Sequence, residues 1–208
     1  MESFNIPINL IQIFLKVKKP ISEFPLFQAN KILWTKYSEL KGYRYIFIGD
    51  DDVEQYLGEH KKFYYDLKYT WQRIDFLRYL VLNKIGGVYL DLDIEPNFDL
   101  DLFSLYQKKY IIGNWFNPKS QKYEVSNSII GCCCGDLTSL IKYCRGQTER
   151  INSMEVYEVR KARAMLNSTG VRAFKRWCKL EQLTYTPELP DYVIDHCSAT
   201  WLGKDQFN

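Results

Sequence analysis

A chain of 208 residues with 46% hydrophobic content is long enough to bury a substantial core, and we expect residues 1–208 to form a single domain. The net charge of +3 comes from 28 basic and 25 acidic residues, and the lysines are scattered between acidic residues, which argues against a nucleic-acid partner. The six cysteines show no repeated C-x-x-C spacing, which argues against a zinc framework and favours free thiols in a reducing compartment.

The first apolar run, from Ile6 to Leu15, is interrupted by Pro7, Asn9 and Gln12, and no basic leader precedes it. This run is too short and too polar to cross a bilayer. We therefore expect no transmembrane segment in this chain and a cytoplasmic location, in a bacterial, viral or cytosolic setting rather than the Golgi lumen.

Hydrophobic periodicity predicts strands alternating with helices along the chain. We expect strands over residues 6–14, 43–48, 88–94, 110–115, 125–130 and 183–185. We expect helices over residues 29–40, 52–60, 71–85, 136–143, 154–166 and 171–179. This alternation favours an α/β fold in which helices flank a central mixed, mostly parallel sheet.

Two aspartates stand in the segment GGVYLDLDI at residues 86–94. Apolar residues alternate with Asp91 and Asp93, which predicts a single strand with both carboxylates on the same side. Ligands of α/β sheets bind at the carboxyl ends of strands. Two carboxylates that converge there suit Mn²⁺ or Mg²⁺, since these cations combine carboxylates with the phosphate oxygens of a substrate.

The helix expected before this strand carries Asp75 and Arg78, three residues apart and therefore on one face, in an otherwise apolar segment. A half-buried ion pair would explain both residues without a function. Buried charges are costly unless they are paired or used, which makes both residues candidates for a site. Arg78 is a candidate for binding a diphosphate or a sugar, and Asp75 for accepting hydrogen bonds from ribose or sugar hydroxyls.

The segment RIDFLRY at residues 73–79, followed by GGVYLDLD at residues 86–93, resembles the core of the glycosyltransferases with a DXD sugar-binding motif. This is glycosyltransferase family 32, which contains α-1,6-mannosyltransferases and is related to clostridial toxin glucosyltransferases. The resemblance implies a GT-A fold and a retaining, metal-dependent hexosyltransferase. It implies transfer of a hexose from a UDP- or GDP-sugar to a hydroxyl of a glycan, glycolipid or protein, in glycan or polysaccharide synthesis.

Weaker matches extend this resemblance over nearly the whole chain, in the order of the family's motifs. Gln12, in the first strand, is a candidate contact to the nucleotide base. Asn127 matches a segment that places an amide near the transferred sugar, and Thr169-Gly170 is similar to the family's T-G-P turn.

The closing segment HCSATW at residues 196–201 resembles the family's H-x-x-x-[GA]-[ST]-W motif. We expect His196 to complete the metal site of Asp93 and Asp91, and Thr200 and Trp201 to bind the substrate's phosphates. Asp93 is the expected direct metal ligand, while Asp91 serves ribose and metal-bound water. Glu95 is expected at the solvated surface.

Two alternatives stay open. An aspartate-nucleophile phosphatase or phosphotransferase would use Asp91 as the nucleophile and Asp93 as the acid, although it also needs a later lysine and acidic pair. A non-catalytic nucleotide-sugar-binding module is the other alternative. It is suggested by Ile11 and Phe14, which stand where the family has a histidine and a tryptophan.

Overall fold

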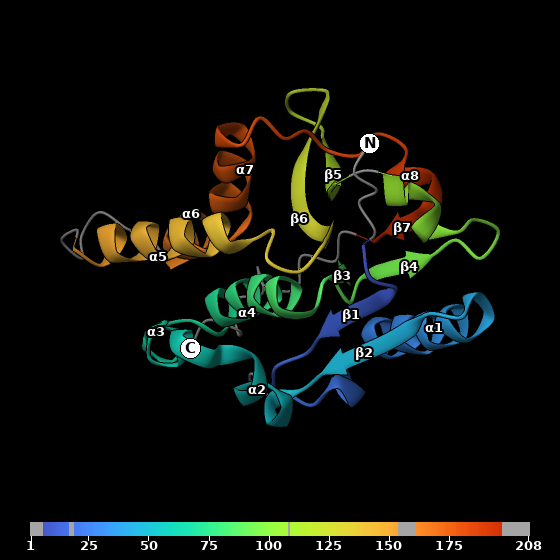
Figure 1. Cartoon of the computed structure of the whole chain (residues 1–208), viewed down its shortest axis with the longest axis horizontal. Helices are drawn as coiled ribbons and strands as arrows, with labels where there is room; N and C mark the ends of the chain where they lie inside the picture. The colour runs from blue at the N-terminus through green and yellow to red at the C-terminus, as the bar shows by residue number, and fades with distance from the viewer. Residues whose placement is uncertain (1–5, 17–18, 108, 154–160, 197–208) are drawn as a thin grey trace.

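The structure is a computed structural model that describes residues 6–16, 19–107, 109–153 and 161–196 (Figure 1). The strands are β1 (Asn9–Ile13), β2 (Arg44–Ile48), β3 (Gly87–Leu90), β4 (Ile94–Pro96), β5 (Ile111–Asn117), β6 (Lys122–Cys132) and β7 (Val193–Asp195). The helices are α1 (Pro25–Lys41), α2 (Glu54–Leu57), α3 (Lys61–Asp66), α4 (Thr70–Ile85), α5 (Thr138–Asn152), α6 (Lys161–Ser168), α7 (Val171–Leu180) and α8 (Leu189–Tyr192).

A five-stranded mixed sheet in the order β2-β1-β3-β6-β5 forms the centre of the molecule. β1 pairs in parallel with both β2 and β3, whereas β6 is antiparallel to β3 and to β5. A separate two-stranded ribbon joins β4 to β7. The chain leaves β1 toward β2 on one side and returns to β3 on the other. The carboxyl ends of β1 and β3 therefore lie at a switch point, where open α/β sheets bind ligands.

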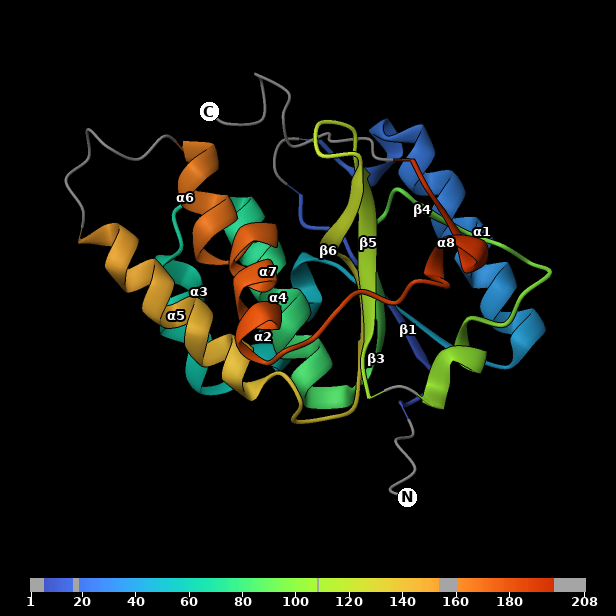
Figure 2. The ribbon, with the colours of Figure 1, turned by 90° about the horizontal axis from the view of Figure 1, so that it is seen from above.

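Helices cover both faces of this sheet, as Figure 2 shows: α2 to α7 lie on one side, and α1 and α8 lie on the other. The alternation within the strands explains the two apolar layers, since successive side chains point to opposite faces. Ile11 and Tyr89 enter the core beneath α4, α5 and α7, while Leu10, Val88 and Leu90 enter the core beneath α1. The predicted α/β layering is confirmed.

Gly86 follows the last residue of α4 and Gly87 starts β3, between the helix and the strand expected over residues 71–85 and 88–94. Gly86 has a φ of +62° and Gly87 a φ of +116°, in the region that favours glycine. A Cβ at Gly86 would lie 2.7 Å from Pro7 Cγ, and one at Gly87 would lie 2.6 Å from the carbonyl oxygen of Asn9. Gly86 therefore allows the chain to turn sharply after α4. Gly87 allows β3 to begin in close contact with the backbone of β1.

The single strand predicted over residues 88–94 is wrong. β3 ends at Leu90 and β4 begins at Ile94, so that Asp91, Leu92 and Asp93 form a turn, called the acidic turn below. The amide of Ile94 donates to the carbonyl of Asp91 at 3.1 Å, an i to i+3 bond that closes the turn. The alternation of side chains that placed both aspartates on one strand face therefore does not apply to them.

Two other predicted elements differ from the structure, and a third is described only in part. Residues 183–185 form no strand, and the following residue, Thr186, donates one backbone bond to Ile112. The helix predicted over 52–60 is divided into α2 and two short 3-10 turns, because Gly58 adopts a φ of +48°. The helix predicted over 154–166 is described only from Lys161, and residues 154–160 lie outside the described part of the chain.

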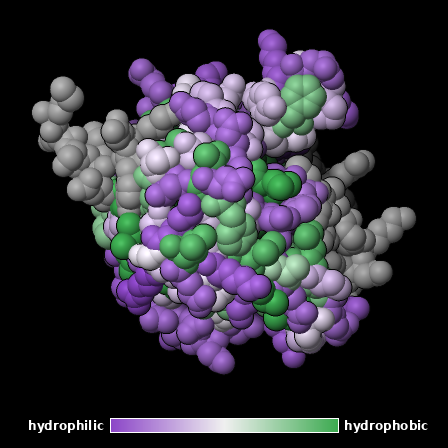
Figure 3. All heavy atoms as spheres, turned by 90° about the vertical axis from the view of Figure 1, so that its right-hand side faces the viewer, coloured by the Kyte–Doolittle hydropathy of each residue, from purple (hydrophilic) through white to green (hydrophobic). Residues whose placement is uncertain are grey.

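The face on the right of Figure 1 is a mosaic of hydrophilic and hydrophobic residues, with the hydrophobic ones in separate small groups (Figure 3). Among the described residues, no helix combines the length and apolar character needed to cross a membrane.

Candidate functional site

The acidic turn lies at the carboxyl end of β3, in the middle of the sheet and beside β1. The amide of Asp91 donates to the carbonyl of Ser128 on β6 at 2.8 Å, which continues the β3–β6 ladder by one residue. Asp91 is therefore fixed by the sheet itself. Asp93, two residues further on, accepts a bond at its carbonyl from the amide of His196 at 3.1 Å.

Side chains from α1 and β1 hold the backbone of the acidic turn. On α1, Asn30 Nδ2 donates to the carbonyl of Leu92 at 2.9 Å, and Trp34 Nε1 donates to the carbonyl of Ile94 at 2.7 Å. On β1, Gln12 Nε2 donates to the carbonyl of Asp91 at 3.2 Å. All three side chains are buried, so that these bonds are shielded from water. These bonds fix the backbone of the acidic turn before any ligand binds.

Arg78 on α4 joins the acidic turn to the neighbouring helix. Its guanidinium lies 2.9 Å from Asp75 Oδ1 and 3.1 Å from Asp91 Oδ1, and it donates to the carbonyl of Asn127 at 2.7 Å. Only 6% of the Arg78 side chain is exposed. Arg78 therefore acts as an internal link between two carboxylates. Its Nε has no partner among the described groups, although it is buried.

Asn127 on β6 completes this arrangement. Its Nδ2 donates to Asp75 Oδ1 at 3.0 Å and to the hydroxyl of Tyr79 at 3.2 Å, while that hydroxyl donates to the carbonyl of Thr169 at 2.8 Å. Asp75, Arg78, Asp91 and Asn127 thus form one connected cluster, called the acidic cluster below. The sequence predicted all four as site residues, and the structure brings them together from α4, β6 and the acidic turn.

Burial and neighbouring charges set the proton affinities in the acidic cluster. Burial raises the pKa of Asp75 to about 6, against the lowering effects of Arg78 and Asn127. Burial also raises the pKa of Asp91 to about 7, again against Arg78, and the charge of Asp93 adds to the rise. Because 31% of the Asp91 side chain is exposed, solvent screens part of this effect, but the upward direction of its pKa holds. A positive charge added beside Asp91 would favour its ionised form.

Burial alone would lower the pKa of Arg78, but the charges of Asp91, Tyr89 and Asp75 outweigh it and raise that pKa. Arg78 is therefore a permanent cation. It faces the carboxyl groups of Asp75 and Asp91, and Asp93 adds a third carboxyl group from the same turn, so that the ionised site carries an excess of negative charge. Such a site suits a divalent cation.

The donor set gives a further test of whether a metal fits. Asp91 and Asp93 offer hard carboxylate oxygens, and Mg²⁺ is usually held by one or two carboxylates with water and substrate phosphates. The described residues contain no group of three His, Cys, Asp or Glu side chains placed to hold an ion. A cation held by Asp91 and Asp93 as they are placed here would therefore take phosphate oxygens and water among its remaining ligands.

His196 follows β7 and lies beside the acidic turn, but its imidazole contacts Glu95. The distance from His196 Nε2 to Glu95 Oε2 is 2.9 Å, and about a third of each side chain is exposed, at 34% and 33%. The assignment of His196 as a metal ligand stays a prediction. Thr200 and Trp201 lie outside the described residues.

Gln12 is completely buried, and both ends of its amide are used. Its Nε2 donates to the carbonyl of Asp91, and its Oε1 accepts a bond from the hydroxyl of Tyr45 at 2.7 Å. Its predicted contact to a nucleotide base stays a prediction. The observed role is support of the acidic turn from β1.

Sequence reasoning missed several residues that shape the site. The hydroxyl of Tyr89 donates to Asp91 Oδ1 at 2.6 Å, and the guanidinium of Arg78 lies 4.5 Å from the centre of the Tyr89 ring. Asn30 and Trp34 were missed as well. Tyr89 stands inside the quoted motif, and Asn30 and Trp34 share one helical face at an i, i+4 spacing, but neither signal reveals a partner so distant in the sequence.

Comparisons with known proteins identify the motif. Residues 27–121 match the model of the family described as "Glycosyltransferase sugar-binding region containing DXD motif". The matched range contains Asp75, Arg78, Asp91 and Asp93. No curated protein matches the sequence.

Among solved structures, "PaToxG Glycosyltransferase" has a TM-score of 0.50 and 14% identity, over 89% of this chain and 72% of that chain. A glycosyltransferase involved in the glycosylation of the major capsid of PBCV-1 has a TM-score of 0.44 and 12% identity, over 74% of this chain and 72% of that one. The UDP-bound glycosyltransferase domain from the YGT toxin has a TM-score of 0.43 and 13% identity, over 78% of this chain and 55% of that one. The predicted resemblance to the DXD glycosyltransferases is confirmed, and so is the GT-A type of α/β fold.

Proposed function

We propose that this chain, a relative of the DXD glycosyltransferases, transfers a hexose from a nucleoside-diphosphate sugar to an acceptor hydroxyl, with residues 1–208 acting as one catalytic domain. The observation that supports this most is the acidic cluster. A buried arginine holds Asp75 and Asp91 at the switch point of the sheet, beside a second aspartate of the same turn. Buried charges arranged in this way are typical of sites that bind charged ligands.

Asp93 and Asp91 are the residues that we propose to hold Mn²⁺ or Mg²⁺, with His196 as a further candidate ligand. When bound, the cation would neutralise charge that develops on the diphosphate leaving group. Asn30, Trp34 and Gln12 hold the backbone of the turn, so that the two carboxylates need little reorganisation when the substrate binds.

Arg78 and Asn127 have different proposed tasks. Because the guanidinium of Arg78 is occupied by Asp75, Asp91 and the carbonyl of Asn127, we assign it as a positioning residue that orients both aspartates. The amide of Asn127 fixes Asp75, whose carboxylate is the proposed acceptor of hydrogen bonds from ribose or sugar hydroxyls. Thr200 and Trp201 are the proposed contacts to the diphosphate.

The family resemblance supports retention of the anomeric configuration. In the proposed reaction the bond between the anomeric carbon and the diphosphate oxygen breaks, and the bond to the acceptor oxygen forms on the same face of the sugar. The acceptor hydroxyl gives its proton to the departing diphosphate oxygen in this step. We propose a role in glycan or polysaccharide synthesis.

Binding of UDP and GDP, measured by calorimetry with and without Mn²⁺, tests the central step of this proposal. We expect one nucleotide to bind more tightly with Mn²⁺, and Asp93→Asn to abolish that gain. Asp99→Asn is the matched control, since Asp99 is an exposed aspartate six residues further along the chain. A nucleotide affinity that changes neither when Mn²⁺ is added nor when Asp93 is replaced by Asn would contradict the proposal.

A donor screen then separates an enzyme from a non-catalytic binding module. We expect nucleotide release from one of UDP-glucose, UDP-galactose, UDP-GlcNAc and GDP-mannose, and loss of that release in Asp93→Asn. Binding without release or transfer would favour the module. A phosphatase would instead release inorganic phosphate from simple phosphate monoesters in the absence of any sugar acceptor.

A further inference from the structure

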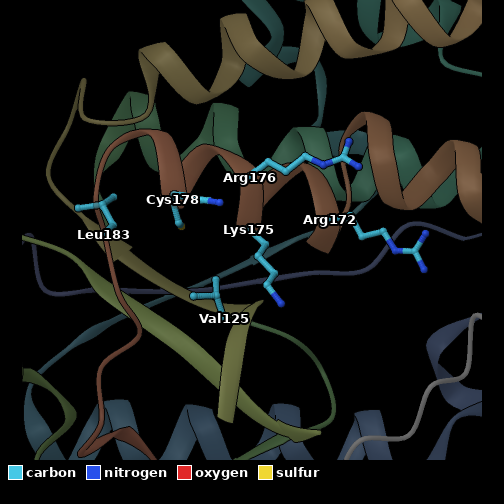
Figure 4. A pocket seen from close by; sticks show the side chains of 7 residues that line it. Val125, Arg172, Lys175, Arg176, Cys178 and Leu183 are labelled. Atoms are coloured by element: carbon cyan, nitrogen blue, oxygen red, sulfur yellow. The ribbon is translucent and has the colours of Figure 1, made fainter. Parts of the chain in front are cut away.

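A second concave region lies between α7 and β6, and Figure 4 shows it from close by. It is a groove with a volume of about 480 Å³, in the range of ordinary ligand sites. Val125 of β6 and Leu183 form part of its wall. The remaining lining is mainly cationic, and consists of Arg172, Lys175, Arg176 and Lys179 of α7.

The amphipathic pattern of α7 explains why the cations lie together on one face of this helix. Ala173, Phe174, Trp177 and Cys178 are buried against the core, whereas the four cations are exposed on the other side of the helix. Lys175 reaches toward β6 and pairs with Glu124. Within the described residues, no ion pair engages Arg172, Arg176 or Lys179. The groove therefore has a surplus of positive charge that is available to a ligand.

The groove starts beside the acidic cluster. Val125 and Asn127 lie two residues apart on β6, which corresponds to about 7 Å along a strand, so that one wall of the groove continues into the cluster. Gly170, immediately before α7, also lies beside the cluster, since a Cβ there would lie 3.1 Å from Asp75 Oδ2. The strand and the helix that line the groove therefore both lead to the acidic cluster.

Aromatic rings flank the groove on the side of the β5–β6 hairpin. Tyr123 is 50% exposed, and its ring centre lies 5.4 Å from that of Phe116 and 6.3 Å from that of Tyr185. Tyr123 precedes Val125 by two residues on β6, and Tyr185 follows Leu183 by two residues, so that both lie close along the chain to residues that line the groove. Exposed aromatic faces of this kind offer apolar contact to the ring faces of sugars.

We propose that the groove is the acceptor site, and that the acceptor is a glycan carrying carboxylate, sulfate or phosphate groups. This inference rests on the proposed function, since an acceptor presupposes a transferase. The cations bind the acidic groups, and arginine suits planar carboxylates in particular. The aromatic rings bind the sugar faces. The concave shape favours a flexible chain over a flat membrane surface.

The test measures binding of trigalacturonic acid, an acidic trisaccharide, to the full chain by calorimetry. Fully methyl-esterified trigalacturonate is the neutral control, and hexaglutamate is the peptide control. We expect the acidic glycan to bind, the neutral glycan to bind at least about tenfold more weakly, and added salt to weaken binding. Arg172→Glu/Arg176→Glu should reduce binding of the acidic glycan by about tenfold or more, because it removes two charge-assisted contacts.

Two variants keep this test specific. Arg172→Lys/Arg176→Lys should restore most of the affinity, because it keeps the charge. Lys36→Glu/Lys142→Glu makes the same change in net charge at exposed positions of α1 and α5, and should leave binding unchanged. Equal loss in both charge-reversal variants would overturn the groove as the site. Binding of hexaglutamate as tight as that of the glycan would overturn the glycan as its occupant.

Nucleotide binding measured on the same samples separates this inference from the proposed function. If the acidic glycan binds in the groove but neither UDP nor GDP binds with Mn²⁺, the proposed function and the role of acceptor both fail. If a nucleotide binds but the glycan does not, the acceptor inference fails and the proposed function stands.

Discussion

The acidic cluster and the groove between α7 and β6 use charge in opposite ways. In the cluster, Arg78 is 6% exposed and is bound by two carboxylates and a carbonyl. In the groove, Arg172 and Arg176 are exposed at the surface of α7. Buried charges must be compensated within the fold, whereas exposed charges are solvated and need no partner. The cluster is therefore preorganised, while the groove can adapt to a ligand.

Replacing the buried arginine should have the largest effect. Arg78→Met leaves Asp75 and Asp91 without their cation, and we expect a loss of about 3–5 kcal/mol in the free energy of unfolding at pH 7. Arg176→Met, the same change in the groove, should alter it by no more than about 0.5 kcal/mol. Urea denaturation of both variants measures this difference. A similar loss in both would show that burial does not distinguish the two regions.

Changing the pH should reveal the cost of burying carboxyl groups in the cluster. The unfolded chain ionises Asp75 near its ordinary pKa of 3.8, whereas the folded chain holds the proton up to about 6. Stability therefore falls as the pH rises from about 4 to 6, by an amount on the order of 2 kcal/mol for this group.

Asp91 should extend this decline toward pH 7, where its own raised pKa lies. Mn²⁺ should reverse the trend near neutral pH, because it favours the ionised carboxylates, and its affinity should fall as the pH drops below about 7. Chemical denaturation between pH 4 and 8, with and without Mn²⁺, measures both effects. The lowered pKa values of His60 and Glu54 act in the opposite direction, so the test compares the original chain with Asp75→Asn. A stability difference between these two proteins that does not change with pH would contradict the raised pKa of Asp75.

A methyl group at the junction of the two regions should have a smaller effect. A Cβ at Gly170 would lie 3.0 Å from Leu166 Cα, 3.1 Å from Asp75 Oδ2 and 3.1 Å from the carbonyl of Met165. Two of these neighbours are backbone atoms and cannot easily move, so Gly170→Ala should cost about 1–3 kcal/mol. Thermal unfolding and Mn²⁺ binding measure the result.

Gly146→Ala is the control for that change. Gly146 lies within α5, and a Cβ there would meet nothing within 4 Å. The variant should therefore be as stable as the original chain or more stable by about 0.5–1 kcal/mol, because alanine favours a helix. If Gly170→Ala behaved like Gly146→Ala, the contact between α7 and the cluster would not be tight.

The amino-acid sequence by itself determined the layers, most of the strands and helices, and the members of the acidic cluster. These features depend on signals that are local along the chain, namely the alternation of apolar residues, the glycine pair after α4, the spacing of Asp75, Arg78 and Asp91, and the separate match at Asn127. The resemblance to the DXD glycosyltransferases rests on the same local pattern.

Only the tertiary structure decided how the aspartates are held. Alternation predicted a strand through Asp93, but bonds from Asn30 and Trp34, more than fifty residues earlier in the chain, accompany a turn at that place. The sequence did not predict the groove either, since the residues of α7 predict only an amphipathic helix. Its cations line the groove because packing places α7 against β6, and such contacts between distant segments have no local signal.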